Sequence, residues 1–162
     1  MHLKHELEIF INDDSTSLIL GSFPSVKSRE YGFYYSHPQN RFFMVLSRVF
    51  SEPCPNNIEE RKIFLKKHHF ALYDVVEECD ILNSDDSSIK NVIPIDIEGI
   101  LTKYPHIKVI GITGKKAAEL FDKYLKDKVD IDVIYLPSSS PRNARMKIEV
   151  LIDKYKAIKK YE

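Results

Sequence analysis

The chain contains few of the residues that form disulfide frameworks or thiolate metal sites. Cys54 and Cys79 are the only cysteines among its 162 residues, and no C-x-x-C pair is present. This scarcity argues against a disulfide-stapled fold and against cysteine-bound zinc or iron–sulfur, and it suits a reducing compartment. We therefore expect a cytoplasmic protein.

Long hydrophobic runs are also missing. No apolar stretch approaches the roughly 20 residues that a membrane span needs, and the opening residues, MHLKHE, lack the apolar core of a signal peptide. With 43% hydrophobic and 30% charged residues, the composition is typical of a globular protein, and the length fits one domain covering residues 1–162. We expect a monomer without a membrane partner.

The net charge is zero, but the two signs are unevenly distributed. Residues 74–98 contain eight acids and one base, whereas residues 142–162 contain seven bases and three acids. A basic end beside a polar loop can bind phosphate groups. On charge alone, a solvated final helix is the simpler explanation.

Apolar runs alternate with helical patterns along the chain. The spacing of apolar residues predicts strands at 17–20, 70–73, 108–112 and 132–136, and helices at 41–50, 58–68, 96–104 and 115–125. Asn57 is expected to cap the second of these helices, and Ser140 a long final helix that starts at Pro141 or Arg142. The acidic stretch through Ser88 is expected to be a loop. Strands separated by helices imply an α/β fold of three layers, α/β/α, around a short, mainly parallel sheet.

Two polar loops follow predicted strands at opposite ends of the chain. The first has the sequence GSFPS at residues 21–25 and continues to YYSHPQNRFF at residues 34–43. The second is LPSSSPRNA at residues 136–144. In an open α/β sheet, loops at the carboxyl ends of strands are where ligands bind. We expect the two loops to form the two sides of one cleft.

The first loop offers groups that can receive a flat ligand. Gly21 allows a close backbone approach, and Pro24 stiffens the loop. Phe23 and Tyr35 offer ring faces on which a base could stack, at ~1–3 kcal/mol per base. Asn40 stands where a helix is expected to begin, so its carboxamide could point into the cleft. Taken singly, core packing of the rings and a helix-capping role for the asparagine are the plainer explanations.

The second loop could hold a phosphate. Ser138, Ser139 and Ser140 supply hydroxyls and backbone amides beside an expected helix N-terminus. Arg142 adds a rigid, charged fork close by. Taken alone, the string is explained equally well as a serine-rich turn with a helix cap.

Together, the motifs GSFP, YYSHPQNRFF and LPSSSPRNA resemble those of the uracil-DNA glycosylase superfamily. The nearest branch is that of the hypoxanthine-DNA (DNA-deoxyinosine) glycosylases, and the mismatch-specific uracil/thymine branch is next. Residues 72–76, 85–89 and 110–117 also fit the family pattern, so the resemblance covers nearly the whole chain. It implies a single α/β/α domain, in agreement with the alternation of strands and helices.

The chain departs from the family pattern at three positions. Ser22 stands where the mismatch branch has asparagine, which argues against efficient uracil removal and favours the deoxyinosine branch. Ser25 replaces a usual glycine, and Phe43 replaces a usual tryptophan. Of the three, the serine in the first motif bears most directly on the substrate.

The resemblance implies an enzyme of base-excision repair. It would hydrolyse the N-glycosidic bond of a deaminated base, hypoxanthine in deoxyinosine, in double- or single-stranded DNA, and would act near the nucleoid. The nucleotide is first flipped out of the stack, and water then attacks. Neither motif has a lysine placed for a Schiff base, so we expect a monofunctional enzyme that leaves an abasic site, without metal or cofactor.

The same resemblance assigns roles to both loops. A carboxamide does not titrate near neutrality, so Asn40 is expected to orient water or hold the base rather than act as a general base. Arg142 is expected to fill the space that the flipped nucleotide leaves. The full set of expected site residues is catalytic Asn40 and Ser22; base-binding Gly21, Phe23, Pro24, Tyr35, His37 and Phe43; and DNA-binding Ser138, Ser139, Ser140, Arg142 and Asn143.

Three other functions stay open at this point. One is uracil excision, broad or mismatch-directed, and another is a non-catalytic nucleic-acid-binding module of the same fold. A small nucleotide or phosphate-ester hydrolase would need a P-loop, which the sequence lacks, or a metal-binding carboxylate pair. The pair Asp85 and Asp86 could bind a metal in principle, but we expect it in a solvated loop.

Overall fold

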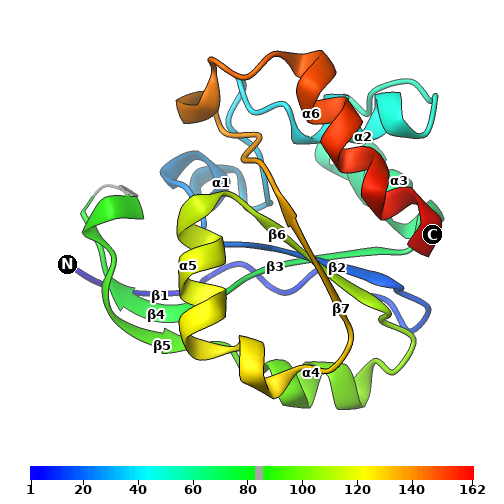
Figure 1. Cartoon of the computed structure of the whole chain (residues 1–162). Coiled ribbons are helices and arrows are strands. Elements are labelled where there is room, and N and C mark those ends of the chain that lie inside the picture. The colour runs from blue at the N-terminus through cyan, green and yellow to red at the C-terminus, as the bar shows by residue number, and fades with distance from the viewer. Residues whose placement is uncertain (83–85) are drawn as a thin grey trace.

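A computed structural model of the chain describes residues 1–82 and 86–162. Its centre is a parallel sheet of four strands in the order β3-β2-β6-β7 (Figure 1). The strands are β2 (Ser17–Gly21), β3 (Phe70–Asp74), β6 (Val109–Thr113) and β7 (Asp132–Leu136). They confirm the four strands predicted from the apolar runs, and they place all four carboxyl ends at one edge of the sheet.

The two central strands are buried on both faces. Every residue of β2 and β6 is buried, which is why both strands read as continuous apolar runs rather than as alternating patterns. Leu18 and Leu20 face one hydrophobic cluster, and Ile19 between them faces the other. Side chains that alternate in this way join the sheet to a helical layer on each side.

Helices cover both faces of the four-stranded sheet (Figure 1). Buried residues of α2 (Phe42–Val49), α3 (Ile58–Lys67) and α6 (Ile148–Tyr155) pack in the cluster of Ile19, whereas those of α4 (Ile97–Lys103) and α5 (Lys115–Tyr124) pack in the cluster of Leu18. The three-layer α/β/α prediction is therefore confirmed. The predicted cap of α3 is confirmed too, because the Asn57 side chain accepts a hydrogen bond from the Glu60 amide at 2.8 Å.

A small antiparallel sheet corrects one prediction. Its order is β1-β4-β5, with β1 (His2–Lys4), β4 (Val76–Asp80) and β5 (Lys90–Pro94). The acidic stretch was expected to be a loop, which is wrong for β4, because backbone pairing on both sides and burial of Val76 and Cys79 outweigh the acidic composition. A short 3-10 turn, η1 (Asp86–Ser88), follows, while Asp85 lies outside the described residues.

A short helix after the first loop was not predicted. This helix, α1 (Val26–Tyr31), has six residues, too few for an apolar period to show in the sequence. The Ser25 hydroxyl caps it by accepting a hydrogen bond from the Ser28 amide at 3.1 Å, and Gly32 ends it in the left-handed region. Ser25 thus has a structural role as a helix cap.

The final helix begins later than predicted. A 3-10 turn, η3 (Pro141–Asn143), comes first, and the Ser140 hydroxyl caps it by accepting from the Arg142 amide at 3.2 Å. The chain then turns before α6, because the Arg41 guanidinium donates hydrogen bonds to the backbone carbonyls of Asn143 and Met146. The predicted cap is confirmed, but the predicted long helix from residue 141 is wrong.

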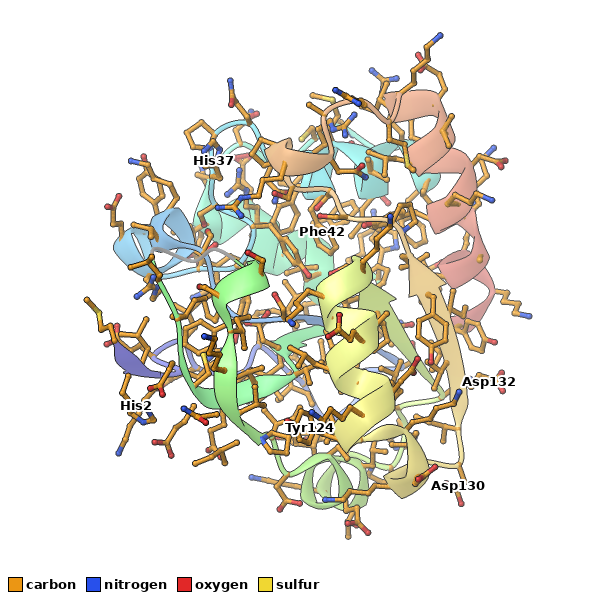
Figure 2. The ribbon with its side chains drawn as sticks, turned by 60° about the vertical axis from the view of Figure 1, so that its left-hand side comes forward. His2, His37, Phe42, Tyr124, Asp130 and Asp132 are labelled. Atoms are coloured by element: carbon orange, nitrogen blue, oxygen red, sulfur yellow. The ribbon has the colours of Figure 1, made fainter. Side chains whose placement is uncertain are left out.

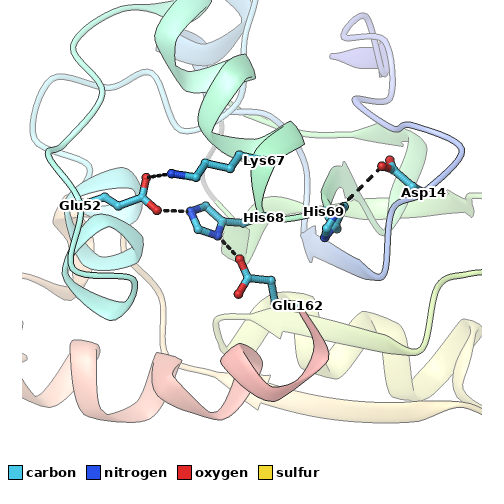
Figure 3. Close-up of polar contacts among 6 residues, drawn as sticks. All are labelled: Asp14, Glu52, Lys67, His68, His69 and Glu162. Carbon is cyan, nitrogen blue, oxygen red and sulfur yellow. Dashed lines mark hydrogen bonds and ion pairs between the residues drawn. The ribbon is translucent and has the colours of Figure 1, made fainter.

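The last residues are tied back to the body of the fold. Two further 3-10 segments, η2 (Lys126–Lys128) and η4 (Lys156–Tyr161), follow α5 and α6. Beyond η4, the Glu162 carboxylate contacts Nδ1 of the His68 ring. The second ring nitrogen, Nε2, lies 2.7 Å from the Glu52 carboxylate (Figure 3). Within the described ranges, no helix has both the length and the apolar character to cross a bilayer.

Candidate active-site cleft

The carboxyl ends of β2, β3 and β6 open into a cleft of about 480 Å³. Both predicted loops line it, from opposite sides, as expected for the carboxyl edge of a parallel sheet. The lining consists of residues 21–28, 34, 35, 37, 39, 40, 74, 113 and 138–142. A volume of this size is in the range of small-molecule binding pockets.

The cleft has a buried floor and an exposed rim. Phe23, Asp74 and Thr113 are buried, whereas Gln39 and Arg142 are exposed. Figure 2 shows His37 at the outer edge of the molecule and Phe42 inside it. A ligand that enters therefore passes charged and polar groups first and reaches aromatic rings and buried polar groups at the floor.

Asn40 connects the two loops. Its Oδ1 accepts hydrogen bonds from the Ser139 hydroxyl at 2.8 Å and from the Phe42 backbone amide at 2.9 Å. A backbone amide can only donate, so the atom facing it is the carboxamide oxygen. With the oxygen held by two donors, Nδ2 is the end of this side chain that a ligand in the cleft can use. The second bond closes a turn just before α2, but the expected N-cap role is wrong, because Arg41 holds the N-cap position and no side chain caps this helix.

The second loop is braced by hydrogen bonds to itself and to Arg41. The Asn143 side chain donates to the Ser138 carbonyl at 2.8 Å and does not line the cleft. Arg41 donates to the carbonyls of Met146 at 2.7 Å and Asn143 at 2.9 Å, and its own amide donates to the Ser139 carbonyl at 3.1 Å. This arginine was not among the site residues predicted from the sequence. Its position directly after Asn40 was the available signal.

The backbone of the first loop has a defined orientation. The Gly21 carbonyl accepts from the Val75 amide at 2.8 Å, and the Ser22 carbonyl accepts from the Val76 amide at 3.1 Å. No peptide bond among the described residues is cis, and in a trans peptide the C=O and N–H groups point in opposite directions. The backbone amides of Ser22 and Phe23 therefore point away from β4. Donors to a ligand in the cleft would need this orientation.

Tyr35 is held in an unusual backbone conformation beside the floor. Its φ is +55°, in the left-handed region that bulky residues rarely adopt. One face of its ring stacks on Phe42 at a centroid distance of 3.9 Å, and its hydroxyl lies 3.5 Å from the Thr113 hydroxyl. Burial, and after it the nearby Asp74 carboxylate, raises the pKa of Tyr35, so its hydroxyl remains protonated and can donate.

The remaining predicted site residues fall into two groups. Gly21, Phe23, Pro24 and Ser140 line the cleft with the residues above. His37 lines the rim, where its Nδ1 accepts from the Gln39 amide at 3.0 Å, which shapes the turn before α2. Phe43 does not line the cleft; it is buried in the core, with the Arg61 guanidinium 4.9 Å from its ring centre.

The structure adds two residues that the sequence analysis gave no role. Asp74 ends β3 and lines the floor, and its Oδ2 lies 2.8 Å from the His5 ring nitrogen Nε2. Asp74 could have been found from the sequence, because it is a carboxylate at the end of a predicted parallel strand. The histidine comes from the N-terminal segment, and no pattern in the sequence links it to this site.

The cleft contains donors and one acid but little that would hold a metal. Among the described residues, no group of three or more histidine, cysteine or carboxylate side chains is placed to bind a metal ion. The carboxyl edge of the sheet instead offers a fixed carboxamide, two oriented backbone amides and an arginine at the rim. Such groups can hold a flat heterocycle and stabilise negative charge that develops on it.

Known proteins with similar sequences point to one family. The sequence pattern of the uracil DNA glycosylase superfamily matches residues 9–160. A hypoxanthine DNA glycosylase of Methanosarcina acetivorans is 29% identical over 144 residues, which are 88% of this chain and 90% of that protein. One of Methanosarcina barkeri is 29% identical over 136 residues, covering 83% and 85%.

The fold is shared with a solved structure. The solution NMR structure of a candidate uracil DNA glycosylase from Methanosarcina acetivorans is 26% identical, with a TM-score of 0.81 over 98% of this chain and 99% of that one. The match extends over both loops and the sheet between them. The chain belongs to the uracil DNA glycosylase superfamily.

Proposed function

We propose that this protein is a monofunctional DNA glycosylase that releases hypoxanthine from deoxyinosine. The observation that carries the proposal is the carboxamide of Asn40, pinned by Ser139 across the cleft so that its amide nitrogen is the usable end. The curated relatives named hypoxanthine DNA glycosylase support the choice of base. Ser22, in place of the asparagine of the mismatch branch, supports it as well.

Binding begins with extrusion of the damaged nucleotide. Unstacking costs a few kcal/mol and is easiest for a mispaired base such as hypoxanthine. Arg142 lies on the exposed rim, in the turn that follows the serine loop, where it can enter the duplex as the base leaves. The base then lies at the floor, between the first loop and Tyr35.

Bond cleavage places negative charge on the departing base. Nδ2 of Asn40 donates to the base or to the attacking water, and the amides of Ser22 and Phe23 are oriented to donate as well. Fixed donors of this kind, worth ~3–4 kcal/mol each when well placed, stabilise the leaving group without having to reorganise. No step in this sequence needs a covalent bond to the enzyme.

Lys27 is the one lysine among the described residues of the lining. Its Nζ lies 3.3 Å from the Glu30 carboxylate, one helical turn along α1. Because this amine is exposed and engaged in an ion pair rather than desolvated, it is a poor candidate for a Schiff base. The products distinguish hydrolysis by water from Schiff-base chemistry, since a Schiff-base enzyme cleaves the DNA strand itself, whereas hydrolysis leaves an abasic site.

The test is base release from matched oligonucleotides that carry one deoxyinosine, one deoxyuridine or neither. We expect strand breaks at deoxyinosine only after alkali, and release of hypoxanthine as the free base. Asn40→Ala should abolish release while preserving DNA binding, and Asn56→Ala, an exposed asparagine outside the cleft, should leave it intact. Full activity of the Asn40 variant, or breaks without alkali, would contradict the proposal.

Uracil is the second candidate substrate, because the solved relative is described as a candidate uracil DNA glycosylase. Ser22→Asn should raise uracil release at least tenfold if the residue at this position separates the two branches. Efficient uracil release by the unaltered protein would keep the chemistry and overturn this interpretation of Ser22. Binding without release of either base would favour a non-catalytic module.

A further inference from the structure

Asp74 is the single acidic residue among the described residues that line the cleft. It lies at the floor, where its side chain is 7% exposed. A carboxylate that is nearly buried must be held by donors, and a base that reaches the floor meets it directly. This carboxylate has no part in the chemistry proposed above.

His5 fixes one oxygen of this carboxylate. Its Nε2 lies 2.8 Å from Oδ2 of Asp74, and its side chain is 1% exposed. The ring packs edge-on against Tyr73 at 4.6 Å and Phe23 at 5.9 Å, and the His5 backbone amide donates to the Glu77 carbonyl at 2.7 Å.

In the described part of the chain, the imidazole is hydrogen-bonded to Asp74. Its other nitrogen, Nδ1, is buried and has no hydrogen-bond partner among the described residues. Because a carboxylate only accepts, the proton lies on Nε2. His5 lies outside residues 9–160, the part of the chain that matches the superfamily.

The second oxygen of the carboxylate lies against the first loop. A Cβ placed on Gly21 would come within 2.7 Å of Oδ1 of Asp74, so only glycine leaves the carboxylate in place there. The same position is 3.7 Å from the Thr113 hydroxyl and 3.8 Å from the Tyr35 hydroxyl. The floor thus presents an acceptor oxygen flanked by two hydroxyls.

Deamination changes the base edge in a way that such an acceptor detects. Adenine has a lone pair on N1, whereas hypoxanthine has an N1–H beside a carbonyl. Cytosine and uracil differ in the same way at N3. A carboxylate accepts from a ring N–H and repels a ring lone pair. A buried polar group left without its partner discriminates strongly against the wrong ligand.

We propose that Asp74, oriented by His5, accepts the ring N–H that separates a deaminated base from its amino parent. The inference rests on the proposed glycosylase function and extends it to the recognition of the base. Asp74 is then a specificity residue, because it touches the base, and His5 is a positioning residue, because it acts through Asp74. A general base would instead act on water beside the sugar, which stays with the DNA backbone near the rim, whereas Asp74 lies at the floor.

The test pairs each base with an analogue in which a methyl group replaces the hydrogen of the ring N–H, so that the lactam is kept and the donor is lost. Oligonucleotides carry hypoxanthine or 1-methylhypoxanthine, and uracil or 3-methyluracil. Single-turnover release is measured for the unaltered protein, Asp74→Ala and Asp74→Asn. The intrinsic lability of each glycosidic bond cancels when the ratio of rates within a pair is compared between enzymes.

We expect the unaltered protein to release the N–H base at least tenfold faster than its analogue, and the ratio to fall to about one in Asp74→Ala. In Asp74→Asn, His5 holds the amide oxygen and turns the NH2 toward the base, so the ratio should also be lost. Asp80→Asn, a carboxylate outside the cleft, should preserve it. A ratio unchanged in both Asp74 variants, with all rates lowered equally, would overturn the proposal.

The role of His5 has its own control. His5→Ala should lower the ratio, and His5→Gln, whose amide can donate to Asp74, should restore much of it. His2→Ala removes a similar histidine–carboxylate contact, with Glu78 and Asp80, at the exposed edge of the small sheet and should leave the ratio unchanged (Figure 2). A ratio unaffected by His5→Ala would overturn the positioning role.

The two proposals fail in different ways. If the protein releases uracil but not hypoxanthine, the proposed substrate is wrong, and the uracil pair still tests Asp74. If it releases hypoxanthine with no difference between N–H and N-methyl bases, the substrate stands and the role of Asp74 is wrong. Release of neither base overturns both.

Discussion

The hydroxyl of Ser139 donates a hydrogen bond to Oδ1 of Asn40 at 2.8 Å, and this bond joins two loops that lie 99 residues apart in the sequence. Ser139 is only 2% exposed, so water cannot easily replace it as the donor. The serine that sequence analysis assigned to DNA thus also fixes the side chain expected to act on the base.

Ser139→Ala should slow base release about tenfold, because an amide held by one donor in place of two is less well oriented and a small misplacement of a reacting group is costly. DNA binding should change little. Ser47→Ala is the matched control, since this buried serine donates to the Met44 carbonyl and does not line the cleft. Single-turnover rates of both variants test the prediction. Equal rates for the two variants would contradict it.

Arg41→Ala should lower the free energy of unfolding by about 2–3 kcal/mol, because it removes two charged hydrogen bonds to the carbonyls of Asn143 and Met146. Base release should fall as well, since the second loop loses its brace. Arg48→Ala, an exposed arginine of the adjoining helix α2, should change stability by less than about 0.5 kcal/mol. Denaturant unfolding compares the two, and similar losses would refute the bracing role.

Arg142→Ala should slow release from a duplex about tenfold more than from a single strand. A side chain that fills the gap left by the flipped nucleotide stabilises an extrusion step that a single strand hardly needs. The measurement is a pair of single-turnover rates on the same sequence, single-stranded and paired. Equal losses on both substrates would show that the arginine contributes through the phosphate backbone instead.

Glu52 should make stability depend on pH in acid. Burial disfavours its charge, but hydrogen bonds from Lys67 at 3.1 Å and His68 at 2.7 Å outweigh burial and lower the pKa below the ordinary 4.5 (Figure 3). A carboxyl whose pKa is lowered by folding stabilises the protein above its unfolded pKa and loses that effect as the pH falls through the folded value. Its stabilising contribution is therefore full at neutral pH.

Glu52→Gln should reduce the free energy of unfolding by about 1 kcal/mol at neutral pH. The difference from the unaltered protein should shrink toward zero as the pH falls below 4.5. Glu8→Gln, at an exposed position, should show no such trend. Denaturant unfolding across this range provides the measurement, and a difference that is constant with pH would contradict the assignment.

Sequence patterns predicted the elements correctly where a strand is buried on both faces or where a helix cap involves residues close in sequence. The strands β2 and β6 are buried on both faces and read as unbroken apolar runs. Asn57 caps α3 through a contact three residues away, which sequence alone displays. The strand β4 was missed because its acidic residues look like a loop, and only its pairing with β1 and β5 makes it a strand.

The site divides in the same way. Both loops were found from sequence, because polar and small residues that follow apolar strands mark the carboxyl edge of a parallel sheet. Phe43 was expected to bind the DNA base but lies in the core instead. The sequence does not indicate which side of a helix an aromatic residue will face in the fold. The contact of His5 with Asp74 joins residues 69 apart, and neither residue predicts the other.

The α/β/α layers and the two loops could be predicted from local periodicity, and the motifs of the loops carried the resemblance to the superfamily. Which atoms meet depends on the folded chain: the oxygen of Asn40 meets Ser139, the guanidinium of Arg41 meets the second loop, and the imidazole of His5 meets Asp74. Hydrogen bonds act over about 3 Å, and only the folded chain brings residues so far apart in sequence within that distance.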